Sequence, residues 1–214
     1  MYTYEIRDNR CTFTFDERAE ELCRSISSMK YLTGFTMTPT YDKLSFHAHD
    51  VRRLADFVDR KPNKLAAITY QQAVSMIKHL GGQLFHLERQ KRSVLWLDIQ
   101  HVFVINRQHF FYFGNDDVVP LTTSDAMAFF VPTQLSTRSF AAPEFTEIES
   151  LPAHIPRQAP YYSLGAMIAF CLFSDIDPQN ISLVQLSPII DTKLYWFLLR
   201  ATEPCPTKRS LLFV

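Results

Sequence analysis

Glycine is scarce in this chain of 214 residues, and the scarcity excludes one class of binding site. The five glycines are Gly34, Gly81, Gly82, Gly114 and Gly165. A glycine-rich loop that holds phosphate needs several glycines within a few residues, because the backbone must approach the phosphate closely. No segment has that density, so every motif of this kind is excluded.

The chain also lacks an excess of charge of either sign. It carries 22 basic and 22 acidic side chains, which gives a formal net charge of zero. A bulk electrostatic attraction to nucleic acid or to anionic lipid therefore has no basis, and we expect neither partner. The hydrophobic fraction of 47% is high enough for the chain to bury a core and fold.

Long apolar runs and paired cysteines are missing as well. The longest apolar stretch, residues 166–173, falls short of the roughly 20 residues that span a bilayer, and we expect no secretory leader in the first ten residues. The cysteines are far apart and form no C-x-x-C pair, which favours reduced thiols, no metal site, no cofactor and a cytoplasmic location. They are Cys11, Cys23, Cys171 and Cys205.

The pattern of apolar residues predicts small strands first and helices afterwards, which is typical of an α+β fold. We expect a hairpin over residues 2–15, a helix from Asp16, strands near 35–38 and 44–49, and a short helix over 51–58. Thr69 and Gln72 have the spacing of a capping box, which predicts a long helix from Thr69 to about Arg89. After it we expect a strand or turn at 93–97, a hairpin over 102–113, a loop over 116–142, an apolar helix over 162–173, and helical segments at 193–200 and 209–213.

Four short segments resemble, in the correct order, the lower lobe of a eukaryotic-type protein kinase. Leu97-Asp98 follows the long helix, where that family has its catalytic loop, and Ala142-Pro143-Glu144 matches the end of its activation segment. Tyr162-Ser163-Leu164-Gly165 resembles the start of the buried central helix, and Cys205-Pro206-Thr207-Lys208-Arg209 resembles a motif near the end of the domain. The resemblance implies that Pro143 and Gly165 are structural residues and that Glu144 and Arg209 form an ion pair.

The resemblance implies a protein-kinase-like α+β fold with a reduced N-lobe of few strands and a mostly helical C-lobe. Residues 1–50 would form the N-lobe-like segment and residues 51–214 the C-lobe-like domain. About 15 residues precede the first predicted helix, which is enough for one hairpin and too few for three strands. The part of the fold that covers the nucleotide would then be cut away. An aromatic cleft would be left less covered, to be filled by the N-terminal segment or to bind a partner: Trp96, Phe103, Phe110 and Phe111.

Most of the parts that phosphoryl transfer requires are missing or changed. Asp98 keeps the position of the catalytic base, but Gln100 stands where the family has a lysine. Phe103 stands five residues after Asp98, in the place of an asparagine that binds metal, and a phenyl ring offers Mg²⁺ no oxygen ligand. The metal-binding Asp-Phe-Gly falls near Asn115–Val118, so Asp116 is a degenerate site residue. Pro160 replaces the aspartate that anchors the catalytic loop.

These changes predict a catalytically inactive pseudokinase that works as a protein-interaction or scaffold module, with protein partners. The loss of N-lobe strands and catalytic motifs is similar to that in compact kinase-like proteins of large DNA viruses. This resemblance implies a viral or virion-associated role in the host cytoplasm or the virion. Two alternatives stay open. One is an atypical ATP-dependent phosphotransferase that uses Asp98 and Asp116 with a displaced cation: Arg7, Arg10 or Lys43. The other is a structural subunit of a larger assembly.

Overall fold

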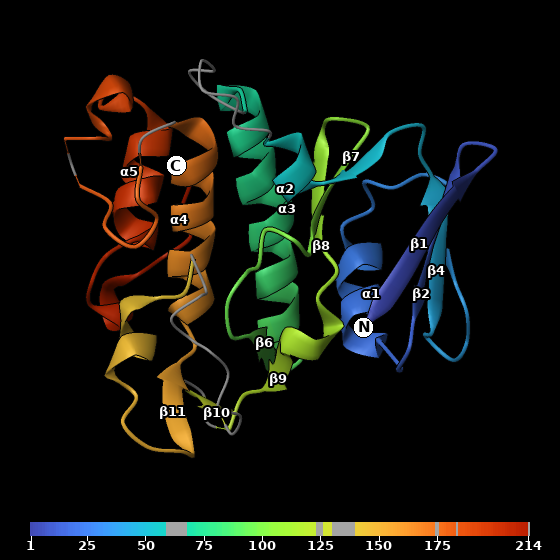
Figure 1. Ribbon diagram of the computed structural model, residues 1–214, viewed down its shortest axis with the longest axis horizontal. Helices are drawn as coiled ribbons and strands as arrows, with labels where there is room; N and C mark the ends of the chain where they lie inside the picture. The colour runs from blue at the N-terminus through green and yellow to red at the C-terminus, as the bar shows by residue number, and fades with distance from the viewer. Residues whose placement is uncertain (59–67, 123–125, 130–139, 174–175, 183, 214) are drawn as a thin grey trace.

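The computed structural model describes residues 1–58, 68–122, 126–129, 140–173, 176–182 and 184–213. Within these ranges the chain forms five α-helices, and every strand pair is antiparallel. The fold is α+β, as predicted. A four-stranded sheet lies at one end of the molecule, and two helices, α4 and α5, lie at the other, with the long helix α3 between them (Figure 1). None of these helices is long and apolar enough to cross a bilayer.

The N-terminal hairpin forms as predicted from β1 (Tyr2–Arg7) and β2 (Arg10–Phe15). Asp8 and Asn9 make a two-residue turn in which both have positive φ, the conformation that matches the twist of a hairpin. The complete sheet has the order β1-β2-β4-β3, with β3 at Thr36–Met37 and β4 at Lys43–His47. β1 is therefore the long outer strand of this sheet.

Helix α1 (Glu20–Ser28) begins four residues later than the sequence pattern predicts. The backbone N–H of Phe15 donates to Asp42 at 2.8 Å, and that of Ala19 donates to Tyr41 at 3.0 Å. These bonds hold the segment from Phe15 to Ala19 against the residues that precede β4. The prediction of a helix that begins at Asp16 is therefore wrong.

The long helix α3 (Tyr70–Arg89) begins at the predicted capping box. The Thr69 hydroxyl accepts from the N–H of Gln72 at 3.2 Å, and the Gln72 side chain accepts from the N–H of Thr69 at 2.9 Å. Residues 51–58 are not one helix. β5 (Val51–Arg53) pairs with β7 (Val102–Ile105), and only α2 (Leu54–Phe57) is helical.

The hairpin of β7 and β8 (His109–Tyr112) separates two apolar clusters, because both of its faces are buried. One face belongs to the cluster of the N-terminal sheet and α1, and the other to the cluster of α3, α4 and α5. A strand that is buried on both faces consists of a nearly continuous apolar run, which explains the unbroken sequences of these two strands. The residues facing the N-terminal cluster are Phe103, Ile105, Phe111 and, just after β8, Phe113.

The predicted loop over residues 116–142 contains strands. β9 (Val118–Pro120) pairs with β6 (Arg92–Val94), and β10 (Ala126–Phe129) pairs with β11 (Ala153–Pro156). These strands are only three or four residues long, and their partners lie more than 20 residues away in the sequence. Periodicity over so few residues gives no signal, so the prediction of a loop is wrong there. Residues 123–125 and 130–139 lie outside the described ranges.

Helix α4 (Ala159–Leu172) is buried on all sides, as predicted, and every residue in it except Phe170 is buried. It packs between α3 and α5 (Lys193–Ala201). The predicted helix over residues 209–213 does not form in the described structure. A short 3-10 turn at Pro206–Lys208 precedes an extended Arg209, whose backbone has φ −68° and ψ 139°.

Gly165 lies where α4 packs closely against the end of α5, and alanine should not fit there. A Cβ at this position would lie 2.8 Å from the Cβ of Ala201 and 2.8 Å from Cγ2 of Thr202. We expect Gly165→Ala to lower the free energy of unfolding by about 1–3 kcal/mol, the usual cost of overpacking, as measured by urea denaturation.

Gly81, in the middle of α3, supplies the control for that substitution. A Cβ there would meet its nearest neighbour, Leu211 Cδ1, at 3.8 Å, an ordinary contact. Because alanine favours helix over glycine by about 1 kcal/mol, Gly81→Ala should be neutral or stabilising. Equal effects of the two substitutions would contradict the close crossing of α4 and α5.

Candidate functional site

The candidate site lies in the loop of residues 95–101, which connects β6 to β7. Asp98 forms a local turn here. Its carboxylate accepts from the N–H of Gln100 at 2.9 Å, and its carbonyl accepts from the N–H of His101 at 2.9 Å. The half-buried Asp98 carboxylate therefore caps its own loop, while the Gln100 side chain is exposed.

Ser163 anchors this loop to the centre of α4. Its hydroxyl accepts from the N–H of Leu97 at 2.8 Å and lies 3.3 Å from the Leu97 carbonyl, and Ser163 is completely buried. Pro160 was expected to mark the loss of an anchor, and the anchor at Ser163 was not predicted. The signal was present as a serine within an otherwise apolar helix, since a buried hydroxyl needs a hydrogen-bond partner.

Phe103 lies at the centre of an aromatic cluster that joins the N-terminal hairpin to β7. Its ring centroid is 5.0 Å from Tyr4, 5.0 Å from Phe13 and 5.9 Å from Tyr2. Phe113 completes the cluster, stacked on Phe13 at 3.9 Å and 5.4 Å from Phe103. The aromatic side chains of β1 and β2 thus fill the space above β7.

The other aromatic residues expected in an open cleft are buried as well. Trp96 is 3% exposed, and Phe110 and Phe111 are fully buried. Trp96 packs edge-on against Phe145 at 5.4 Å. The expectation of a less covered aromatic surface is therefore wrong, and the alternative that the N-terminal segment fills the space is correct for Phe103.

Tyr112, the last residue of β8, is a buried polar residue that the sequence analysis did not select. Its hydroxyl donates to the carboxylate of Asp117. Burial raises the pKa of this phenol well above its ordinary value, and the Asp117 charge adds to the effect. Its backbone is fixed to α3 through Gln83, which accepts from the Tyr112 N–H at 2.8 Å and donates to its carbonyl at 3.2 Å.

Asp116 is exposed at the edge of a pocket of 340 Å³. Its carboxylate lies 3.1 Å from the Met1 ammonium group. The pocket is lined by Met1, Tyr2, Arg53, Gln100, His101, Gly114, Asn115 and Asp116. Asp98 is absent from this lining, so the two carboxylates proposed to act together do not share the pocket.

The cations suggested for a phosphotransferase reaction lie elsewhere. Arg7 pairs with Glu5 at 2.8 Å on the exposed side of β1. Arg10 donates to the Ser45 hydroxyl at 2.8 Å, and Lys43 is exposed on β4. Arg53 of β5 is the arginine that lines the pocket, and the sequence analysis did not select it.

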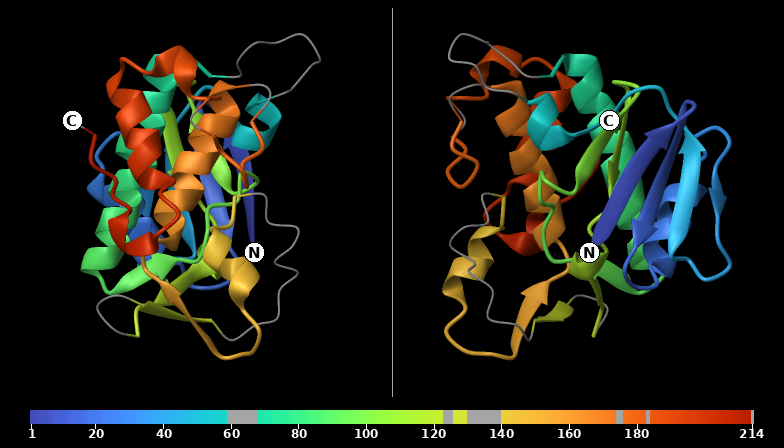
Figure 2. Two further views of the ribbon diagram at one scale, coloured as in Figure 1. Left: turned by 90° about the vertical axis from the view of Figure 1, so that its left-hand side faces the viewer. Right: turned by 45° about the vertical axis from the view of Figure 1, so that its right-hand side comes forward.

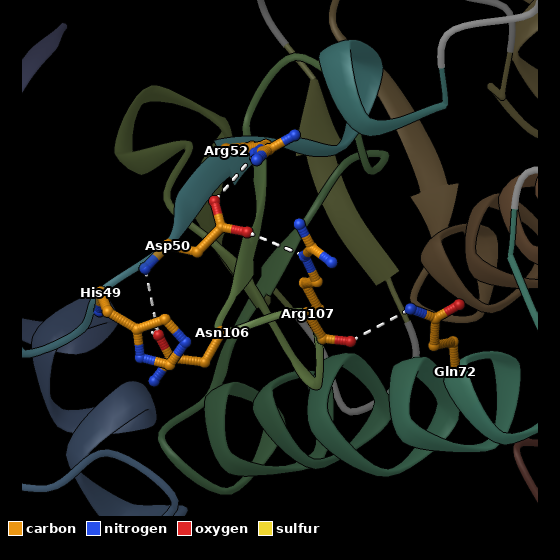
Figure 3. Close-up of polar contacts among 6 residues, drawn as sticks. All are labelled: His49, Asp50, Arg52, Gln72, Asn106 and Arg107. Carbon is orange, nitrogen blue, oxygen red and sulfur yellow. Dashed lines mark hydrogen bonds and ion pairs between the residues drawn. The ribbon is translucent and has the colours of Figure 1, made fainter.

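A polar network holds the linker between β4 and β5 to the β7–β8 turn (Figure 3). Asp50 accepts from Arg52 at 2.8 Å and from Arg107 at 3.1 Å. The Asn106 side chain accepts from the N–H groups of His49 and Asp50 at 3.0 and 3.2 Å. Burial raises the pKa of Asp50, but the charge-assisted bonds from Arg52 and Arg107 outweigh it and hold that pKa below its usual value. The network also reaches α3, because Gln72 of that helix donates to the Arg107 carbonyl at 3.1 Å.

The predicted ion pair between Glu144 and Arg209 is present. Arg209 Nη1 lies 2.6 Å from Glu144 Oε1, and Nη2 lies 2.8 Å from Oε2, so the contact is bidentate. Arg209 also donates to the carbonyls of Glu203 and Pro204 at 2.7 and 3.0 Å. The side chains of Arg209 and Glu144 are 0% and 12% exposed. Pro143 precedes Glu144 in the 3-10 turn Pro143–Glu147, where its fixed φ suits the first helical position.

His79 is buried behind β8 and makes folding sensitive to acid. Its Nδ1 accepts from the N–H of Phe110 at 3.2 Å, which requires an unprotonated nitrogen. Burial lowers the pKa of His79 to about 4, with smaller contributions from His109 and Lys78. Between pH 6.5 and 4 the unfolded chain therefore binds a proton that the folded chain does not, so stability falls as pH falls through this range.

We expect His79 alone to remove about 3 kcal/mol of stability between pH 7 and pH 4, from its pKa difference. Urea denaturation at several pH values measures this loss. In His79→Asn the side-chain oxygen can replace Nδ1 as the acceptor but does not titrate, so the dependence on pH should become shallower. The same slope for both proteins would exclude His79 as the cause.

His47 and His49 are both exposed, His47 at the end of β4 and His49 just beyond it. Across the described ranges, no three side chains of His, Cys, Asp or Glu are grouped so that they could hold a metal ion. No protein-family model matches this chain, and no curated protein matches it. The function must therefore be argued from the geometry.

Proposed function

We propose that this protein is a catalytically inactive, kinase-like protein that acts as a protein-interaction or scaffold module. The order of elements supports the proposal. A long helix, α3, is followed by β6, a loop with Asp98, the β7–β8 hairpin, the segment ending at Glu144, and the buried helix α4. The bidentate contact between Glu144 and Arg209, inferred from the family resemblance alone, adds support because it joins residues 65 positions apart.

The packing of Phe103 is the observation that best supports the proposal that the protein is catalytically inactive. In the proposed fold, the nucleotide base would lie between the N-terminal sheet and β7. That space is filled by contacts of Phe103 with Tyr4 and Phe13, each at 5.0 Å between ring centroids. Phe103 is fully buried, so a base could enter only by displacing it.

The groups near the loop are also unsuited to phosphoryl transfer, which depends on positioned cations and metal ligands. Gln100 supplies no positive charge. Phe113-Gly114 directly follow β8, so Tyr112 stands in the place of the metal-binding aspartate of an Asp-Phe-Gly motif. This alignment begins three residues before Asn115–Val118, the segment that the sequence analysis aligned with the motif. Because the Tyr112 hydroxyl is buried and bonded to Asp117, it offers no free ligand to a metal ion.

Nucleotide binding and transfer test the proposal. We expect no shift in the thermal unfolding midpoint with ATP and either Mg²⁺ or Mn²⁺, and no incorporation of ³²P into the protein or into a general acceptor protein. Incorporation that disappears in Asp98→Ala would overturn the proposal and favour the atypical phosphotransferase. In that case Asp116→Ala should also reduce incorporation, and Asp56→Ala, on α2, provides a matched control.

A role as a structural subunit remains the second candidate within the same non-catalytic class. It differs in requiring a permanent assembly for stability. Sedimentation of the purified chain separates the two, because a folded monomer fits an interaction module and aggregation of the isolated chain fits an obligate subunit.

A further inference from the structure

The free edge of β1 offers unpaired backbone groups. Arg7 and Arg10 close a two-residue turn, and at the other end the N–H of Asp16 donates to the Met1 carbonyl at 3.0 Å. Bonded pairs alternate along an antiparallel ladder, so Thr3, Glu5 and Arg7 use their backbone groups on β2. The N–H and C=O groups of Tyr2, Tyr4 and Ile6 point the other way, and no described residue bonds to them.

β1 carries the charged residues Glu5 and Arg7 on its outer face, but it lacks two other features that protect an edge strand, short length and proline. It is six residues long and contains no proline, whereas β3 at the opposite edge has only two residues. Ile6, on the inner face, is 42% exposed. Edge strands of this kind are templates for an added strand. Figure 2 shows β1 as the outer strand of the N-terminal sheet.

The three-stranded sheet, in the order β8-β7-β5, packs against the N-terminal sheet and extends past the free edge of β1. Phe113 after β8 stacks on Phe13 of β2, and Phe103 of β7 contacts Tyr4 of β1. The next strand, β5, therefore lies beneath the position that a strand added to β1 would occupy. Arg53 pairs with Phe103, and paired residues of antiparallel strands share a face, so the Arg53 side chain is directed into this space.

Arg53 supplies a positive charge at this place. It lines the 340 Å³ pocket at the end of β1, together with Tyr2, Gln100 and Asn115. Asp116 is occupied by the Met1 ammonium at 3.1 Å. Within the described ranges Arg53 has no hydrogen bond or ion pair, so an acidic group from outside would find an available guanidinium.

We propose that an extended acidic segment of a partner protein adds to β1 as a fifth strand and directs an aspartate or glutamate side chain toward Arg53. The backbone of Tyr2, Tyr4 and Ile6 would supply the hydrogen bonds, and the pocket would select the side chain, as in other cases of strand addition. Apolar side chains of the segment, at positions alternating with solvent-facing ones, would cover Ile6. This inference rests on the proposed interaction function and names the chemistry of its partner.

A display library of random ten-residue peptides tests the proposal without knowledge of the partner. The full-length protein is the bait, and Ile6→Pro is the counter-selection, because proline removes an edge-facing N–H that β2 does not use. We expect enriched peptides with alternating apolar residues and at least one aspartate or glutamate on the apolar face. Fluorescence anisotropy with the labelled best peptide then measures affinity.

Matched variants separate the contribution of the backbone hydrogen bonds of β1 to binding from that of the Arg53 charge. Ile6→Pro should weaken binding of the labelled peptide at least tenfold, whereas Ile6→Val, which keeps both the N–H and an apolar side chain, should change binding less than threefold. Arg53→Ala should weaken binding about fivefold and reduce its dependence on salt, whereas Arg7→Ala, on the opposite face of the sheet, should leave both unchanged. Thermal unfolding of Ile6→Pro checks that the sheet remains folded, and Arg53→Ala tests the site independently if it does not.

Three outcomes would overturn the inference: no peptide enriched over the counter-selection, binding that is insensitive to both Ile6→Pro and Arg53→Ala, or self-association of the chain in sedimentation that Ile6→Pro abolishes. The last result would assign the edge to a second copy. None of these results changes the nucleotide experiment, and phosphotransfer dependent on Asp98 would overturn the proposed function without affecting peptide binding. The two failures are therefore distinguishable.

Discussion

Replacing Arg209 by leucine is expected to lower the free energy of unfolding by about 3–5 kcal/mol, because Glu144 would be left as a nearly buried charge without its partner. The Arg209 side chain is 0% exposed and makes four hydrogen bonds, two to Glu144 and two to backbone carbonyls. Chemical denaturation of the purified variant, monitored by circular dichroism, measures the effect.

The double variant provides the control for this pair. Glu144→Leu combined with Arg209→Leu removes both charges, so it should be more stable than Arg209→Leu alone, although the carbonyls of Glu203 and Pro204 lose their donor. Arg209→Lys should also be destabilising, because an ammonium group cannot make the bidentate contact and reach both carbonyls. A loss below 1 kcal/mol in Arg209→Leu would mean that the pair is not a buried contact in solution.

Replacing Phe103 by alanine is expected to cost about 3–5 kcal/mol, the usual range for removing a buried phenyl ring. The ring is fully buried and contacts Tyr2, Tyr4, Phe13 and Phe113. The substitution would leave an apolar cavity where β1, β2 and β7 meet. Such cavities bind small apolar molecules, so benzene should raise the unfolding temperature of Phe103→Ala more than that of the wild type.

Phe85 on α3 gives a matched comparison. It is 43% exposed, and its ring makes an edge contact with Tyr161 at 6.3 Å. Phe85→Ala should change stability by less than about 1 kcal/mol, because the removed atoms are already partly in water. If Phe103→Ala were as mild as Phe85→Ala, the N-terminal hairpin would not be docked on β7, and the argument against nucleotide binding would lose its basis.

Local signals predicted much of this fold correctly. The hairpin over residues 2–15 was predicted, and Thr69 with Gln72 located the start of α3, because turns and caps depend on neighbouring residues. The apolar sequence of residues 162–173 predicted the buried helix. The contact between Glu144 and Arg209 came from the family resemblance, since no local pattern relates residues 65 positions apart.

What the sequence did not reveal depends on long-range contacts. β9 and β10 are strands because β6 and β11 pair with them, and their own three or four residues carry no clear period. Arg209 is extended, and its guanidinium contacts Glu144, 65 positions earlier in the chain. In the candidate site, Ser163 and Arg53 lie against residues that are distant in sequence, namely Leu97 and the other residues that line the pocket. Tyr112 differs, because its hydroxyl bonds to Asp117 only five positions away.

The complete burial of α4 has a consequence for synthesis of the chain. The helix leaves the ribosome before α5 does, and residues 193–201 supply one of the surfaces that cover it. Until those residues emerge, an apolar helix about 20 Å long, at 1.5 Å per residue, is exposed to water on the side that α5 later covers. Nascent chains with exposed apolar surface of this kind are bound by chaperones. Packing of α5 against α4 removes that surface and ends the need for a chaperone.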